Sequence, residues 1–110
     1  MHRAGTDKVY RAIADPTRRA ILDILAVSER SVKDLTAEFS VSQPAISQHL
    51  GELKSANLVA ARKVRRENRY RLTPSPLLPV MHWLDGYRRV VDATGHQWAI
   101  GPVGKAKRKN

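Results

Sequence analysis

The side chains best suited to recognition chemistry lie between Ser42 and Leu53, where amides and hydroxyls recur at Gln43, Ser47 and Gln48. A glutamine amide can donate to and accept from an adenine edge, and a serine hydroxyl can contact several bases or a phosphate. The expected chemistry is hydrogen bonding to the edges of DNA bases in a groove.

The apolar residues of the same segment predict a helix that presents those side chains. Ile46, Leu50 and Leu53 recur at intervals of four and three residues and form a buried stripe, which leaves the polar side chains outside. Ser42 is a typical N-cap residue. Pro44 is tolerated because it falls in the first turn.

A second helix start lies eleven residues earlier, at Ser31. Asp34 follows three residues later, in the spacing of a capping box. The short segment Ser40–Val41 separates the two helices, and Asn57 suits the left-handed position at the end of the second. Two helices joined by a short turn, the second with a polar outer face, predict a helix-turn-helix.

Two further helices are expected nearer the N-terminus. Thr6–Asp7 can cap the first, and Asp15 followed by Pro16 at the first helical position starts the second. Their apolar faces comprise Val9, Tyr10 and Ile13 in the first helix and Ile21, Leu22, Ile24 and Leu25 in the second.

After the helices, the pattern predicts a basic β-hairpin. Leu58–Val64 and Arg69–Leu72 are strand-like and flank a polar turn at residues 65–68. The basic side chains of this hairpin either protect its strand edges from pairing with another strand or contact DNA phosphates. Their place after a groove-facing helix favours phosphate contact. The cations are Arg62, Lys63, Arg65, Arg66, Arg69 and Arg71.

Beyond the break at Thr73–Pro76, a closing helix is expected from Leu77 to Ala93, with an apolar stripe broad for a helix that packs only on its own domain. Residues 1–100 are expected to form one DNA-binding and dimerisation domain, and residues 101–110 a basic disordered tail.

Composition narrows the functional class. Twenty Lys and Arg residues against ten Asp and Glu residues give a formal charge of +10, which suits a polyanionic partner. Cysteine is absent, and no secretory signal or membrane-spanning run is visible, so a cytoplasmic protein is expected. No nucleophile elbow, phosphate loop or metal-hydrolase spacing is present, so an enzyme is not expected.

Together these elements predict a mainly α fold with a small β-hairpin, a winged helix-turn-helix of order α-α-α-α-β-β-α. Over about residues 7–92 the chain resembles the ArsR-type (arsenical-resistance repressor) transcription regulators. The match is carried by residues 14–22 (ADPTRRAIL), 32–35 (VKDL), 42–50 (SQPAISQHL) and 58–59 (LV).

The resemblance implies a homodimer paired through its first and last helices, with the helix that begins at Ser42 in the major groove of an inverted-repeat operator. It implies repression of the protein's own or a neighbouring operon. The implied DNA contacts are Ser42, Gln43, Ala45, Ser47, Gln48 and His49 on the helix, and Arg62, Lys63, Arg65, Arg66 and Arg69 on the wing. The implied dimer contacts are Tyr10, Ile13, Leu84 and Tyr87, to which Trp83 and Trp98 are possible additions, a core position for Trp83 being the alternative.

Many relatives of this type sense metals through a Cys-x-Cys pair, but here Ser31 and Lys33 occupy those positions, and neither suits a soft metal. No metal or cofactor is therefore expected, and the effector stays unknown. A zinc-responsive repressor that uses His82, Asp85, Asp92 and His96 on the closing helix is one alternative. A protein that coats nucleic acid without sequence choice is the other.

Overall fold

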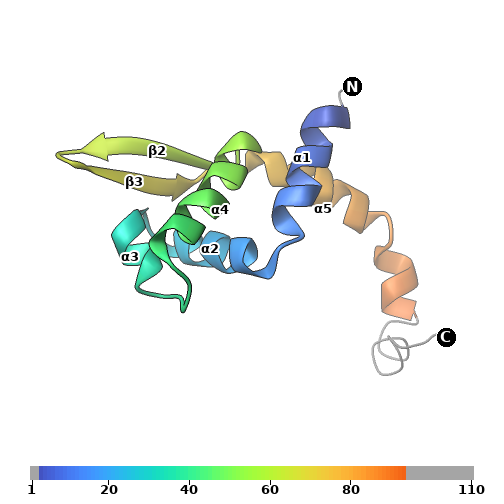
Figure 1. The fold of residues 1–110 in the computed structure, drawn as a ribbon. Helices are drawn as coiled ribbons and strands as arrows, with labels where there is room; N and C mark the ends of the chain where they lie inside the picture. The colour runs from blue at the N-terminus through green and yellow to red at the C-terminus, as the bar shows by residue number, and fades with distance from the viewer. Residues whose placement is uncertain (1–2, 94–110) are drawn as a thin grey trace. The chain divides into compact units, whose positions relative to one another are not determined.

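The computed structural model describes residues 3–93 of the chain, as a set of helices with a small antiparallel sheet (Figure 1). The elements in chain order are α1 (Arg3–Ile13), α2 (Pro16–Val27), β1 (Arg30–Ser31), α3 (Val32–Thr36), α4 (Gln43–Ser55), β2 (Val59–Val64), β3 (Glu67–Leu72), the short 3-10 helix η1 (Ser75–Leu77) and α5 (Leu78–Asp85). This is the predicted mainly helical fold with a hairpin, plus one short strand.

By its internal contacts the chain divides into two compact units, which meet at Pro79 and Val80. The first unit holds the helix-turn-helix and the sheet. The second begins within α5. The prediction of one functional domain over residues 1–100 stays a prediction, and the predicted basic tail lies outside the described residues.

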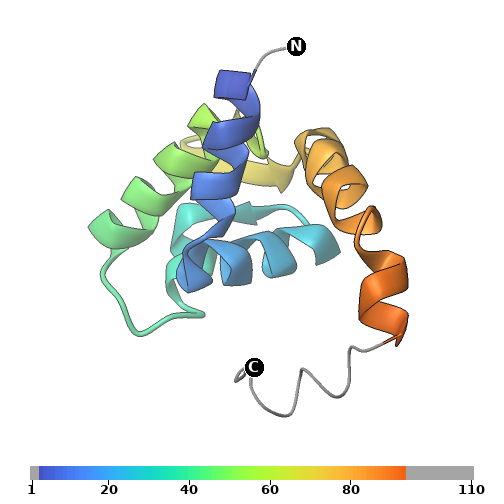
Figure 2. The same cartoon turned by 90° about the vertical axis from the view of Figure 1, so that its right-hand side faces the viewer.

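The first unit has a core built on α1, α2 and α4, each of which contacts the other two (Figure 2). The predicted stripe of α4 is confirmed, because Ile46, Leu50 and Leu53 are fully buried. Burying each such side chain contributes about 1.5–3 kcal/mol. Because this stripe must face the core, the side chains on the opposite face of α4 must point outward.

The junction between α1 and α2 is held by the side chains of the ADPTRR segment. Asp15 caps α2, its Oδ2 accepting a hydrogen bond of 2.9 Å from the Arg18 backbone N–H, and this bond lowers the pKa of the Asp15 carboxyl. Arg18 Nε donates back to the Ala12 carbonyl at 2.7 Å, and Arg19 Nη1 to the Ile13 carbonyl at 2.9 Å. The two arginines thus satisfy carbonyls at the end of α1 that have no partner within the helix.

The predicted starts of α3 and α4 are confirmed by their caps. Ser31 Oγ accepts from the Asp34 backbone N–H at 3.0 Å, and Ser42 Oγ accepts from the Ala45 N–H at 3.3 Å. Capping bonds of this kind are worth about 1 kcal/mol each.

The end of α4 is joined tightly to the sheet. Asn57 has the predicted left-handed conformation, with φ of 61°, and the Leu58 N–H donates to the Leu53 carbonyl at 2.9 Å. This is the bond pattern of a Schellman motif. Thr73, just after β3, closes the junction: its N–H donates to the Leu58 carbonyl at 2.8 Å and its Oγ to the Asn57 carbonyl at 2.6 Å.

The sheet differs from the prediction in two ways. The hairpin turn is only Arg65–Arg66, since Val64 pairs with Glu67, so residues 67 and 68 belong to β3 and not to the turn. Strand β1 was not predicted, because two residues carry no periodicity; it pairs antiparallel with β3, which gives the order β1-β3-β2.

Two helix boundaries were also wrong. Helix α1 begins at Arg3, so Thr6–Asp7 lie inside it rather than capping it. The closing helix is not continuous from Leu77 to Ala93: α5 ends at Asp85, a turn follows at Gly86–Tyr87, and helical conformation resumes over residues 88–93. At Gly86 an added Cβ would lie 3.3 Å from the Trp83 carbonyl, so the turn favours glycine.

Candidate nucleic-acid interface

The outer face of α4 presents the predicted hydrogen-bonding side chains to solvent. Ser42, Gln43, Ser47 and Gln48 are exposed, and Ala45 is half-buried. No other described residue engages the side-chain amides of Gln43 and Gln48, so both are available to a partner. Their position on the first half of the helix is the one from which recognition helices contact base edges.

His49 lies differently from its neighbours on α4. It is half-buried, and its Nδ1 lies 3.3 Å from Arg18 Nη1 and 3.9 Å from Asp15 Oδ2. The imidazole therefore attaches α4 to the junction of α1 and α2. A DNA contact by His49 stays a prediction, and its described contacts are those of a residue that orients the helix.

The β2–β3 hairpin extends past α3 and forms the wing (Figure 1). Its tip is the turn Arg65–Arg66, and Arg65 adopts a φ of 59°, which a non-glycine residue rarely takes. Lys63, Arg65 and Arg66 are exposed, and among the described residues none of them forms an ion pair. We call these three residues the wing tip.

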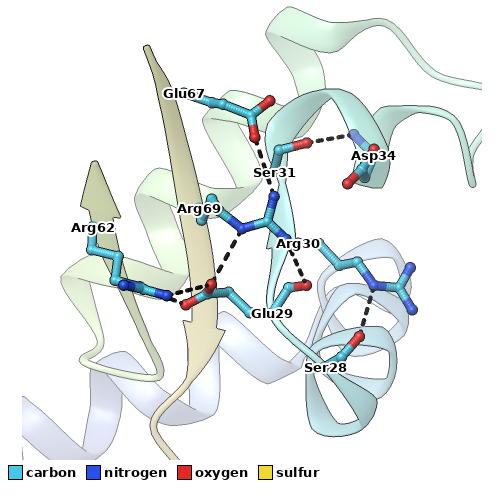
Figure 3. Close-up of polar contacts among 8 residues, drawn as sticks. All are labelled: Ser28, Glu29, Arg30, Ser31, Asp34, Arg62, Glu67 and Arg69. Atoms are coloured by element: carbon cyan, nitrogen blue, oxygen red, sulfur yellow. Dashed lines mark hydrogen bonds and ion pairs between the residues drawn. The ribbon is translucent and has the colours of Figure 1, made fainter. Parts of the chain in front are cut away.

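Two cations in the middle of the wing are bound to carboxylates (Figure 3). The Glu29 carboxylate accepts two hydrogen bonds from Arg62, of 3.0 and 3.1 Å, and one of 3.2 Å from Arg69 Nε. Arg69 also donates to Glu67 Oε1 at 3.1 Å. We call Glu29, Arg62, Glu67 and Arg69 the wing base.

These bonds change the acid–base behaviour of the wing base. The hydrogen bond from Arg62, followed by that from Arg69, lowers the pKa of the Glu29 carboxyl. The same contacts raise the pKa of Arg62 and of Arg69. The formal charges of the two acids and the two arginines cancel.

The predicted dimer residues carry exposed apolar surface in the second unit and half-buried surface in the first. Leu84 and Tyr87 are 54% and 49% exposed, whereas Tyr10 and Ile13 are half-buried. Trp83 is 52% exposed, so it does not occupy the alternative core position, and its ring meets Tyr87 edge to face with centroids 5.2 Å apart. Trp98 lies outside the described residues.

The part of the chain that the structure describes contains no cluster of potential metal ligands that would support the zinc alternative. His82, Asp85 and Asp92 are exposed, and residues 3–93 contain no group of three or more potential ligands. His96 lies outside that range. None of the described helices is long and apolar enough to span a membrane.

A helix-turn-helix followed by a two-stranded wing, with an exposed polar face on its second helix, defines a winged helix-turn-helix protein. Residues 15–61 match the sequence profile of bacterial regulatory proteins of the arsR family. The chain belongs to the ArsR family of transcriptional regulators. It is 38% identical to the HTH-type transcriptional regulator Rv2034 of Mycobacterium tuberculosis, over 81% of this chain and 91% of that protein.

Other relatives agree with this assignment. The transcriptional repressor SdpR of Bacillus subtilis is 35% identical over 71% of this chain and 87% of its own. A crystal structure of a possible transcriptional regulator for arsenical resistance is 39% identical, with a TM-score of 0.65 over 74% of this chain and 92% of that one. A more distant ArsR-family crystal structure, 24% identical, shares the fold with a TM-score of 0.73 over 84% of this chain and 95% of that one.

The protein is therefore a DNA-binding transcriptional regulator of the branch without the cysteine metal site, and not an enzyme. Two functional positions escaped the sequence analysis. Arg18 anchors His49, and Glu29 binds two wing cations. Glu29 had no clear sequence signal, because strand β1, which brings it beside the wing, was itself not predicted.

Proposed function

We propose that this regulator is a homodimeric, sequence-specific repressor of its own or a neighbouring operon, and that it acts in the cytoplasm, where the operator is. Helix α4 enters the major groove and the wing tip binds phosphates. The observation that carries the proposal is the pair of amides at Gln43 and Gln48, which no other described residue engages, on the outer face of a helix that its buried stripe holds in place. Amides in this position can read adenine.

The dimer rests on the apolar side chains of the closing segment. Leu78, Met81, Leu84, Val90 and Val91 are all more than half exposed, and such a concentration of apolar surface is typical of an interaction site. Pairing through Leu84 and Tyr87, together with Tyr10 and Ile13 of α1, gives two recognition helices about one DNA turn apart. The operator is accordingly an inverted repeat.

A second candidate, binding of nucleic acid without sequence choice, is favoured by the net charge of +10 and by the wing tip, which forms no ion pair with any residue that the structure describes. The two candidates differ in their response to competitor DNA. Sequence-specific binding survives an excess of random duplex, whereas electrostatic binding does not.

The experiment is selection of binding sites from fragmented genomic DNA by the purified protein, followed by titration of the selected site and of random duplex. Replacing Gln43 and Gln48 by Ala weakens binding to the selected site by about 1–3 kcal/mol for each base that is no longer recognised, with less effect on random DNA. Ser55→Ala is the matched control, because Ser55 lies two turns beyond Gln48 on the same face. It leaves both affinities unchanged.

Equal losses on both DNAs would exclude base recognition by these two residues. Failure to enrich any sequence would favour the second candidate. Light scattering of the same preparation tests the dimer, and a monomeric mass would overturn the assigned interface.

A further inference from the structure

A pocket of about 250 Å³ lies where the wing, α3 and α4 meet. Among its lining residues Ser31 is buried and Val32 is half-buried, and the others are exposed. Those residues come from three elements, with Lys33 on α3, Gln43 on α4, and Arg66, Glu67 and Asn68 on the wing. The volume is below the range typical of pockets for drug-sized ligands, which suits a small group.

The pocket is lined by donors and carries positive charge. Lys33 and Arg66 are cations that form no ion pair within residues 3–93, and the side-chain amides of Gln43 and Asn68 have no partner within that range either. Glu67 is the one acid among the lining residues, and its carboxylate accepts from Arg69 Nη1 at 3.1 Å.

The wing base explains why Glu67 does not cancel this charge. Arg69 is held by Glu29 as well as by Glu67, so a cation is fixed beside the Glu67 carboxylate. With Glu67 balanced in this way, Lys33 and Arg66 give the pocket a net positive charge. Two cations and two amides around a small volume are the donor set of an oxyanion site.

We propose that this pocket binds a phosphate group, supplied by the DNA backbone strand that passes between the groove entered by α4 and the wing. The inference rests on the proposed docking of α4 and the wing tip. It adds Lys33 and Asn68 to the contact surface. Helix α3 thereby contributes a DNA contact, Lys33, in addition to the contacts proposed for α4 and for the wing.

The DNA backbone is the favoured source because the mouth of the pocket is made of the elements that must approach DNA together. A free oxyanion in solution has the same chemistry, so the experiment separates the two sources. Sequence-independent binding of phosphate has a direct signature, since removing one neutralised phosphate lowers the slope of log affinity against log salt by about 0.9.

The first measurement is binding of random-sequence duplex by fluorescence anisotropy between about 50 and 200 mM salt. Lys33→Gln lowers the slope by about 0.9 per protomer, and the wild-type protein therefore loses about threefold more affinity across this range than the variant does. Lys8→Gln is the matched control: Lys8 is an exposed α1 lysine, and its replacement removes the same charge and leaves the slope unchanged. Asn68→Ala weakens binding with no change of slope, because it removes a neutral donor.

The second measurement is a titration with inorganic phosphate against chloride at constant ionic strength, followed by NMR of the Gln43 and Asn68 side-chain amides. A slope loss in Lys33→Gln without saturable phosphate shifts supports the DNA backbone as the source. Saturable shifts that Lys33→Gln abolishes support a phosphate site that also takes the free anion.

The proposal is overturned if Lys33→Gln matches Lys8→Gln in slope and affinity and phosphate causes no saturable shift. Saturable shifts with an unchanged slope would overturn the DNA source alone. Thermal melts confirm that each variant is folded. Because the duplex is random, failure of the proposed operator recognition leaves this result unaffected.

Discussion

The wing base and the wing tip contain the same kind of residue within one hairpin, yet they are used differently. Arg62 and Arg69 are bound to Glu29, whereas Lys63, Arg65 and Arg66 have no carboxylate partner in the described part of the chain. The first pair joins the hairpin to the chain that follows α2. The second group remains available to phosphates.

Strand geometry accounts for the division. Arg62 and Arg69 are directly opposite each other in the antiparallel register, so their side chains share one face of the sheet, and Lys63 points to the other. Glu29 directly precedes β1, which lies beside β3, and its carboxylate reaches Arg69. Counting cations in the sequence therefore overstates how many are free to contact DNA.

The sharpest test of this comparison replaces two of the three wing-tip cations. Replacing Arg65 by Asn, which tolerates positive φ, and Arg66 by Gln lowers the salt slope on random duplex by about 1.8 per protomer, which amounts to roughly tenfold in affinity between about 50 and 200 mM salt. The melting temperature changes little because both residues are exposed. A slope that does not change would remove the wing tip from the phosphate contacts.

A smaller effect, of a different kind, is expected at the wing base. Glu29→Gln leaves Arg62 and Arg69 without their shared carboxylate, so the melting temperature falls modestly, as expected for a partly exposed network. The salt slope stays close to that of the wild-type protein. A steeper slope with an unchanged melting temperature would show that Glu29 competes with phosphate for these arginines instead of bracing the hairpin.

The smallest expected effect is the acid dependence of stability. The folded pKa of Glu29 lies below its ordinary value of 4.5, so near that pH the unfolded chain binds more protons. The stabilisation is present above about 4.5 and is lost as the pH falls through the folded pKa. Thermal melts from about pH 6 to 3 should fall less steeply in Glu29→Gln; Asp15 contributes a similar loss at lower pH. Identical profiles would contradict the assigned role of Glu29.

Local signals predicted much of the fold and of the outer face of α4. Ser31, Ser42 and Asn57 act through bonds to residues within five positions, so their roles could be read from the neighbouring sequence. The stripe of α4 follows from its helical period. What escaped prediction depends on contacts between distant segments: Glu29 meets Arg69 across forty positions, and Arg18 meets His49 across thirty-one.

The junction of α4 with the wing has a consequence for the DNA that the protein accepts. The left-handed turn at Asn57 and the two bonds from Thr73 fasten the end of the helix to the roots of both strands. Helix α4 and the hairpin are therefore held at a fixed distance from each other, so the opening between them is fixed as well. A duplex whose grooves are spaced to that opening binds without distortion, whereas a stiff sequence with another groove width must be bent to fit. We therefore expect the protein to discriminate among sequences at base pairs that no side chain touches.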